Sequence, residues 1–204
     1  MTKDSLAARR GLDHTVYQPA EDSALLARAV TPAISSTDTV LEVGTGSGYV
    51  AEYISEETGA TVVGVDLNPH ACQQTAERGI PVFQGNLVDA VGDHRIDVLV
   101  SNPPYLPRDP GPDRDDWLSM AVVGGETGRE LVTALLNDID RILAPSGRAF
   151  LLLSSLMDID AVLRRIHEEG FTTEEVARDD SFPFEVLAVY CLTRQDSRAS
   201  ATSD

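Results

Sequence analysis

The sequence predicts an α/β fold in which a seven-stranded, mostly parallel sheet ends in an antiparallel hairpin. Apolar strand-like segments alternate with amphipathic helical segments along most of the chain, which is typical of parallel sheets covered by helices. A glycine-rich loop follows the first apolar segment directly. The last two strand-like segments have no helical segment between them, and a parallel connection needs about a dozen residues or more, so this final pair has to be antiparallel.

Each element follows from a local pattern. Apolar residues at helical spacing, with Pro69 near one start and Gly79 after one end, predict helices over 20–30, 49–57, 69–78, 129–143 and 157–169. Short apolar runs predict strands over 39–43, 61–65, 81–84, 96–101, 148–153, 171–177 and 186–193. We expect one domain over 15–193, between a flexible N-terminus, 1–14, and a disordered polar tail, 194–204.

The charge balance is acidic. The 204 residues include 33 Asp and Glu against 16 Lys and Arg, giving a net charge of -17, and Lys3 is the only lysine. This composition favours a salt-adapted protein over an ordinary acidic one, and it disfavours binding to nucleic acid phosphates. The sequence has no long apolar run, and its two cysteines and four histidines are scattered. We therefore expect a cytoplasmic protein that neither enters a membrane nor holds a metal.

A candidate ligand-binding loop, Glu42-Val43-Gly44-Thr45-Gly46-Ser47-Gly48, follows the first strand. Glycines allow a sharp turn there, and the next helix points its free N–H groups at the same place. Asp66 ends the second strand, where a carboxylate can accept hydrogen bonds from ribose hydroxyls. The pattern indicates an adenosine ligand; the alternative is a structural turn. After the third strand, Asn86 and Leu87 are candidates to contact adenine, or Asn86 is an ordinary turn residue.

The fourth strand leads into Asn102-Pro103-Pro104-Tyr105, the candidate reaction centre. Two prolines make this backbone rigid. The Asn102 side-chain oxygen and the Pro103 carbonyl can each accept one N–H of an NH₂ group, and Tyr105 can stack on its plane. Such an arrangement would orient a planar nitrogen for methyl transfer and stabilise its growing positive charge.

These motifs, together with Val16-Tyr17-Gln18-Pro19-Ala20-Glu21-Asp22-Ser23, Asp66-Leu67-Asn68-Pro69 and a run over 124–130, resemble the HemK-like glutamine methyltransferases. The resemblance covers about residues 13–193 and is to the short archaeal and eukaryotic branch, which modifies the Gly-Gly-Gln loop of class 1 peptide-chain release factors. It implies a Rossmann-like class I methyltransferase fold and S-adenosyl-L-methionine as cofactor. Asn102, Pro103, Pro104 and Tyr105 would hold the glutamine.

The resemblance also implies a set of cofactor-binding residues: Tyr17, Pro19, Ser23, Glu42, Gly44, Gly46, Gly48, Asp66, Leu67, Asn86, Leu87 and Asn102. Glu21 would join Tyr17 and Pro19 in a wall over the cofactor. Asn86 departs from the family, whose members often have aspartate there.

Members of this branch usually work with a small zinc-binding activator, so the resemblance implies a heterodimer, with Ile80, Val82 and Phe83 as candidate contacts or, alternatively, as core residues. The long loop over 106–117 is either a substrate-contacting lid or an insert. Other functions remain open: an adenine-N6 methyltransferase acting on DNA or RNA, a protein lysine methyltransferase, or an inactive scaffold that binds a partner.

Overall fold

The computed structural model describes residues 15–108 and 117–195. The predicted flexible N-terminus, most of the predicted lid loop and nearly all of the predicted tail lie outside these ranges. The strands are β1 (Thr39–Val43), β2 (Thr61–Asp66), β3 (Val82–Gln84), β4 (Ile96–Ser101), β5 (Leu143–Ser154), β6 (Phe171–Phe182) and β7 (Glu185–Arg194). The helices are α2 (Glu21–Val30), α3 (Tyr49–Thr58), α4 (Pro69–Glu77), α5 (Trp117–Val122), α6 (Glu130–Ile142) and α7 (Ile159–Glu168), with a short 3-10 helix, η1, over Thr31–Ala33.

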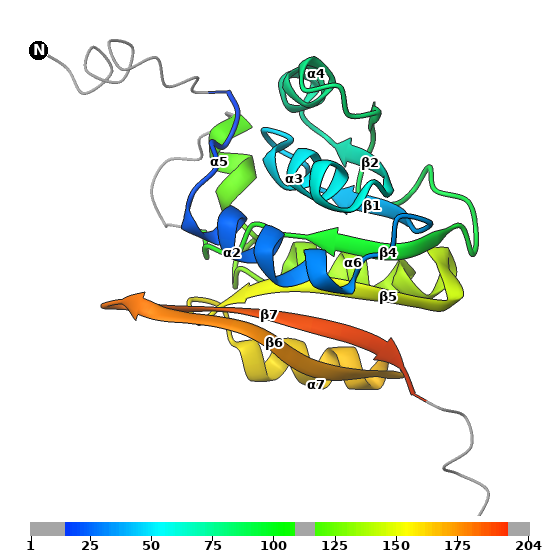
Figure 1. Ribbon diagram of the computed structural model, residues 1–204. Helices are drawn as coiled ribbons and strands as arrows, with labels where there is room; N and C mark the ends of the chain where they lie inside the picture. Colours follow the sequence, from blue (N-terminus) through cyan, green and yellow to red (C-terminus); the bar gives the residue numbers. More distant parts are fainter. Residues whose placement is uncertain (1–14, 109–116, 196–204) are drawn as a thin grey trace, which may run out of the picture.

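The seven strands form one sheet in the order β3-β2-β1-β4-β5-β7-β6 (Figure 1). The first five strands in this order are parallel, and β7 is antiparallel to both β5 and β6. The predicted fold class, a mostly parallel seven-stranded sheet with an antiparallel C-terminal hairpin, is therefore confirmed.

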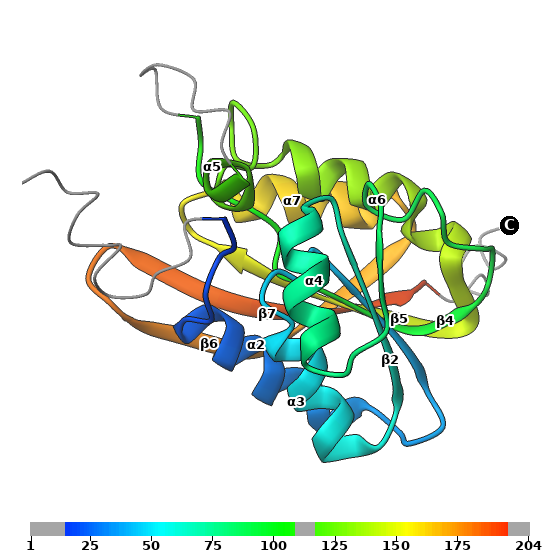
Figure 2. The same ribbon diagram turned by 90° about the horizontal axis from the view of Figure 1, so that it is seen from above.

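Helices cover both faces of the sheet (Figure 2). Alternate strand residues face opposite sides, so Leu99 of β4 packs in a cluster with α6 and α7, whereas its neighbours Val98 and Val100 pack in a second cluster with α2 and α3. The strongly amphipathic pattern of α6 explains its place, because its buried residues all lie on one helical face: Val132, Leu135, Leu136, Ile139 and Ile142.

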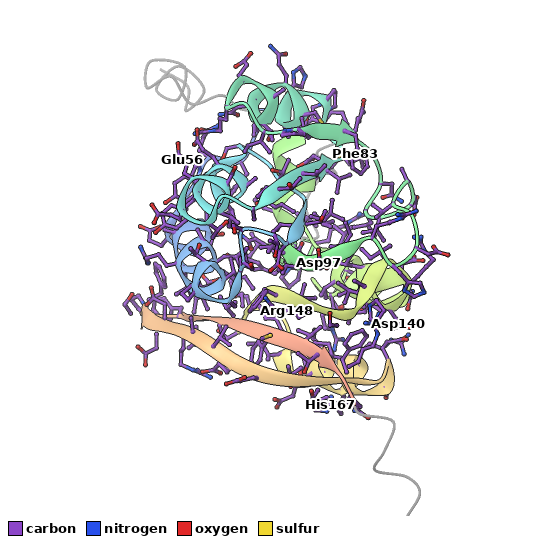
Figure 3. The ribbon with its side chains drawn as sticks, turned by 45° about the vertical axis from the view of Figure 1, so that its right-hand side comes forward. Glu56, Phe83, Asp97, Asp140, Arg148 and His167 are labelled. Carbon is purple, nitrogen blue, oxygen red and sulfur yellow. The ribbon has the colours of Figure 1, made fainter. Side chains whose placement is uncertain are left out.

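At one edge of the sheet lies β3, and Phe83 is near that edge in the side-chain view (Figure 3). Of the two alternatives for Ile80, an exposed partner contact or a core residue, the structure supports the second, because Ile80 is 7% exposed and belongs to the core. Val82 and Phe83 are only partly buried. Ile80 precedes the strand and packs inward beside α3, whereas β3 itself has a free edge.

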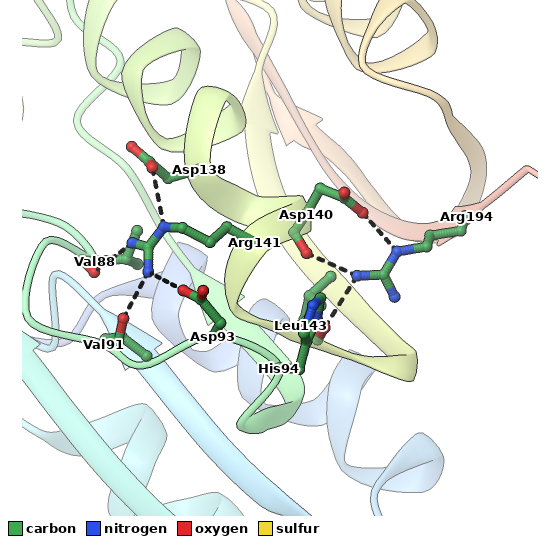
Figure 4. Close-up of polar contacts among 9 residues, drawn as sticks. All are labelled: Val88, Val91, Asp93, His94, Asp138, Asp140, Arg141, Leu143 and Arg194. Carbon is green, nitrogen blue, oxygen red and sulfur yellow. Dashed lines mark hydrogen bonds and ion pairs between the residues drawn. The ribbon is translucent and has the colours of Figure 1, made fainter.

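Strands β5 and β7 extend beyond their predicted bounds, and arginine side chains contact the segment where β5 begins (Figure 4). Arg194 ends β7, one residue beyond the predicted domain, and its guanidinium donates to the carbonyl of Leu143 at 3.0 Å and the carboxylate of Asp140 at 2.6 Å. These contacts support the start of β5 at Leu143, ahead of the predicted residue 148. Arg141 similarly donates to the carbonyls of Val88 and Val91 and to Asp93.

Two further observations bear on the classes of function. Within the described ranges, no helix has the length and apolar character needed to cross a bilayer. The same residues contain no group of His, Cys, Asp and Glu suited to holding a metal ion.

Candidate active site

A cavity of about 340 Å³ opens at the carboxyl edge of the parallel strands. It lies where β1 and β4, neighbours in the sheet, send their following loops, as expected for ligand sites in this architecture. Most of the predicted site residues line it: Tyr17, Ser23, Glu42, Gly44, Gly46, Asp66, Leu67, Asn86, Leu87, Asn102, Pro103, Pro104 and Tyr105.

Two predicted residues, Pro19 and Gly48, do not line the cavity, and neither does Glu21 of the predicted wall. Pro19 and Glu21 are exposed. Gly48 instead allows two helices to meet: its φ is 78°, and a Cβ there would lie 2.8 Å from Thr75 Oγ1 of α4. Glycine is therefore required at position 48 for close packing against α4, and the residue does not line the cavity.

Glu42 anchors the glycine loop from beneath. It is 4% exposed, and its Oε2 accepts hydrogen bonds from Thr45 Oγ1 at 2.6 Å and from the Ala51 backbone N–H at 3.1 Å. Burial raises the pKa of Glu42 to about 8, although these two hydrogen bonds oppose the shift. The carboxyl group thus joins the loop to the first turn of α3.

Asp66 ends β2 and faces the same loop. Its Oδ2 accepts the Gly46 backbone N–H at 2.9 Å, and its Oδ1 accepts that of Asn68 at 2.9 Å. Burial raises the pKa of Asp66, with the backbone hydrogen bonds opposing. A carboxylate oxygen has two lone pairs, so each can accept one further bond, such as one from a ribose hydroxyl.

The segment after β3 brings Asn86 and Leu87 to the cavity. Leu87 has a φ of 47°, a left-handed conformation that is uncommon for a residue with a side chain. Asn86 is exposed, and its amide donates to Asp89 Oδ2 at 3.2 Å, which leaves its side-chain oxygen and its second N–H able to meet a ligand.

The acceptor side of the cavity is built around Asn102. Its Nδ2 donates to Asp22 Oδ2 at 2.9 Å. Its Oδ1 is buried and has no hydrogen-bond partner among the described residues. An unpaired buried acceptor costs free energy, about 1–3 kcal/mol, unless a ligand supplies a donor. The side chain therefore presents a single open acceptor in a cavity-lining position.

Asp22, 4% exposed, holds this geometry and was not among the predicted site residues. Its Oδ1 accepts from the backbone N–H of Ser23 at 2.6 Å and from Ser23 Oγ at 3.2 Å, and its Oδ2 also accepts from Tyr17 OH at 3.2 Å. The motif over 16–23 contains Asp22, but its partner lies 80 residues away. Only a search for a buried carboxylate able to pair with the Asn102 amide could have identified it.

The segment after Tyr105 is braced by residues 122–128. Leu106 N–H donates to the Val122 carbonyl at 2.9 Å, and Gly124 N–H donates back to Leu106 at 3.0 Å. A Cβ on Gly128 would lie 2.2 Å from the Tyr105 carbonyl oxygen, so only glycine permits this close approach. The helix before this brace, α5, was not predicted, and it contributes Trp117, Met120, Ala121 and Val122 to the cavity wall.

Burial is the largest cause that raises the pKa of Tyr17 and of Tyr105, and nearby carboxylates add to it, chiefly Asp22 for Tyr17 and Glu185 for Tyr105. Both phenols stay protonated near neutral pH and are suited to hydrogen bonding and stacking. The cavity thus combines an adenosine-type half, with Asp66 and the glycine loop, and a half with an open amide acceptor between aromatic side chains. These groups fit S-adenosyl-L-methionine and a substrate with a planar nitrogen.

Comparisons with known proteins agree with this geometry. Residues 40–147 match the family described as methyltransferase domain. A protein from Methanocaldococcus jannaschii, provisionally named a protein N5-glutamine methyltransferase, is 33% identical over 85% of this chain and 89% of its own length. The human methyltransferase HEMK2 is 29% identical over 79% of this chain and 82% of its own.

The Mtq2–Trm112 complex of E. cuniculi, which is responsible for methylation of the translation termination factor eRF1, contains a chain of similar structure. Its TM-score is 0.73 and its identity is 26%, over 89% of this chain and 99% of that one. With its fold, its cavity and these relatives taken together, the chain belongs to the HemK-like family of S-adenosyl-L-methionine-dependent methyltransferases.

Proposed function

We propose that the chain methylates the side-chain amide nitrogen of the glutamine in the Gly-Gly-Gln loop of a class 1 release factor. The names of several relatives support this substrate, including release factor glutamine methyltransferases such as that of Geobacter sulfurreducens, 29% identical over 83% of this chain. The observation that carries the proposal is the open Oδ1 of Asn102, held in the cavity by Asp22.

A glutamine amide matches this acceptor. One of its N–H groups would donate to Asn102 Oδ1 and the other to the Pro103 carbonyl, while Tyr105 would stack on the amide plane. S-adenosyl-L-methionine supplies a methyl group activated by its positively charged sulfur. The two acceptors would hold the nitrogen in line with that methyl group and stabilise the positive charge that grows as the N–C bond forms and the bond from methyl carbon to sulfur breaks, which would leave a neutral thioether.

The nitrogen then loses a proton, which restores the neutral amide. An N-alkylated amide nitrogen carrying a positive charge is strongly acidic, so water that reaches it after methyl transfer suffices to accept the proton and no general base is needed. The residues of this chain therefore contribute position and electrostatic stabilisation. Tyr17 and Tyr105, which lie beside the acceptor, help to exclude water from it.

The direct test uses labelled S-adenosyl-L-methionine with release factor, with release factor whose loop glutamine is replaced, and with nucleic acid. We expect label on the release factor only, and none after the glutamine is replaced. Asn102→Ala should abolish transfer while cofactor binding, measured by calorimetry, weakens but persists. Label on nucleic acid alone, or unchanged turnover in Asn102→Ala, would overturn the proposal.

A small zinc-binding activator, as in the family's complexes, is the proposed partner. The supporting features are the structural likeness to a chain of the Mtq2–Trm112 complex and the free edge of β3, where Val82 and Phe83 are partly exposed. An uncovered apolar edge strand favours pairing with another chain. Co-expression should yield a heterodimer that Val82→Lys weakens. A monodisperse chain that is fully active alone would refute the requirement for a partner.

We also propose that the protein acts in the cytoplasm, where translation termination takes place, and that its surface is adapted to salt. The support for salt adaptation is the net charge of -17 with a single lysine. Concentrated salt screens repulsion among surface carboxylates. The midpoint of thermal unfolding should therefore rise steeply between low and molar potassium chloride; a flat response would contradict salt adaptation.

A further inference from the structure

An aromatic side chain stands almost entirely in solvent close to the candidate active site. Phe184 is 92% exposed, in the two-residue turn between β6 and β7. Figures 1 and 2 both place this turn at the end of the molecule that also carries α5 and the start of α2. Turn chemistry gives no reason for phenylalanine at this place, since such turns favour glycine, asparagine and aspartate.

Strand register sets the position of the turn. Ser101, which precedes Asn102, pairs with Leu151 of β5, and β5 continues three residues further to Ser154. Ser154 therefore lies level with Pro104. Ser154 pairs with Leu187 of β7. Measured along the strand direction, residues 184–186 therefore lie beyond Pro104, beside Tyr105 and past it.

Hydrogen bonds fix the turn in this position. Ser154 Oγ donates to Glu185 Oε1 at 2.6 Å. The Ser155 backbone N–H donates to the Val186 carbonyl, and the Val186 N–H donates to Ser155 Oγ, each at 2.9 Å. The Glu185 carboxylate also lies near enough to Tyr105 to help raise its pKa. Hydrogen bonds therefore hold the turn in place, and Phe184 is the neighbour in sequence of Glu185, which lies near Tyr105 of the acceptor motif.

Other exposed apolar side chains gather at the same edge of the sheet. Among the described residues, the large hydrophobic side chains that are exposed are Leu67, Met120, Leu156, Val176 and Phe184. Leu67 and Met120 line the cavity, and Leu156 follows Ser155 next to the turn. Val176, in the middle of β6, is the exception. Exposed apolar side chains at the edge of a site are suited to contact with another macromolecule.

We propose that Phe184 is a docking residue for the substrate protein, whose polypeptide segment beside the methylated glutamine packs on its ring. The neighbouring carboxylates of Asp179, Asp180 and Glu185 would repel the phosphates of a nucleic acid, so charge favours a polypeptide. Apolar contact also remains effective in concentrated salt, which screens attraction between charges. This inference rests on the proposed function.

The test compares Phe184→Ala with the wild type, each co-purified with the activator, in steady-state methylation of intact release factor. We expect kcat/KM for release factor to fall by about tenfold or more through a higher KM, with kcat at saturation, cofactor affinity and thermal stability unchanged. Phe184→Leu should recover most of the activity. Val176→Ala removes an exposed apolar side chain from the same hairpin, away from the cavity, and should behave as wild type.

Equal kcat/KM for Phe184→Ala, Val176→Ala and the wild type would refute the docking role while leaving the proposed function intact. Loss of the activator on gel filtration, or a change in the oligomeric state of Phe184→Ala, would assign the turn to another partner and also refute it. Failure of the wild type to label release factor would instead refute the proposed function.

Discussion

Replacing Asp22 by asparagine tests how the acceptor is oriented. Asp22 Oδ1 accepts two hydrogen bonds from Ser23, so the amide oxygen of the new side chain should keep that position. Its NH₂ group would then face the Asn102 NH₂, which now donates to Asp22 Oδ2 at 2.9 Å. Two donors cannot pair, so Asn102 should turn over and present its NH₂ group to the substrate in place of Oδ1.

The size of the effect follows from this bond. A hydrogen bond to a charged group contributes about 1.5–3 kcal/mol, which is the amount that now holds the open acceptor towards the cavity. Because about 1.4 kcal/mol corresponds to a factor of ten, Asp22→Asn should lower kcat/KM by roughly 10- to 150-fold. The volume of the side chain and the contacts with Ser23 are retained, so the fold should be unaffected.

Single-turnover methylation with labelled cofactor measures the loss, and calorimetry measures cofactor affinity separately. The matched control is Asp160→Asn, the same change in the first turn of α7, on an exposed residue. Tyr17→Phe removes only the 3.2 Å bond to Asp22 Oδ2 and leaves the bond between Asp22 and Asn102 in place, so it should lower kcat/KM less than Asp22→Asn does. If Asp22→Asn turns over as fast as the wild type while Asn102→Ala is inactive, the orienting role is wrong.

Two further predictions concern the glycine loop. The pKa of Glu42 is about 8 in the folded protein, against an ordinary value of 4.5. Between these two values the unfolded chain loses the Glu42 proton and the folded protein keeps it, so the free energy of unfolding falls as the pH rises, by about 5 kcal/mol in total. Glu42→Gln should therefore gain stability over the wild type between pH 5 and 9 in urea unfolding, and a constant difference would contradict this. Gly48→Ala should destabilise more than Gly79→Ala, because both glycines have a positive φ but only Gly48 lies against Thr75. Equal losses in denaturant unfolding would exclude the steric explanation.

Much of the fold follows from local patterns, and the exceptions have identifiable causes. Strand and helix alternation predicted all seven strands. The parallel strands β1, β2 and β4 are short, mostly buried apolar runs, which leave little ambiguity. The start of β5 was misplaced because Pro145 and Gly147 resemble a terminator, whereas Arg194, about fifty residues away, holds the segment extended. The six residues of α5 are too few for a helical period to emerge.

Within the site, most of the residues predicted correctly belong to short continuous motifs, in which glycine or proline restricts the local backbone. The glycine loop from Glu42 to Ser47, Asp66 and the run from Asn102 to Tyr105 line one cavity, as strand order requires. The contacts that orient them were not predictable in this way. Asp22 lies in the first turn of α2 and looks like an ordinary acidic start of a helix.

By itself, the sequence determined the kind of fold, the edge of the sheet that carries the site and the chemistry of the groups there. These follow from the spacing of apolar residues and from glycine and proline, whose effects on structure are local along the chain. Tertiary structure alone decided which atom of Asn102 is free to accept a hydrogen bond, since its partner Asp22 comes from a distant helix. It also decided that the turn carrying Phe184 reaches the level of Tyr105, because strand register across β5 and β7 sets that height and no local pattern encodes it.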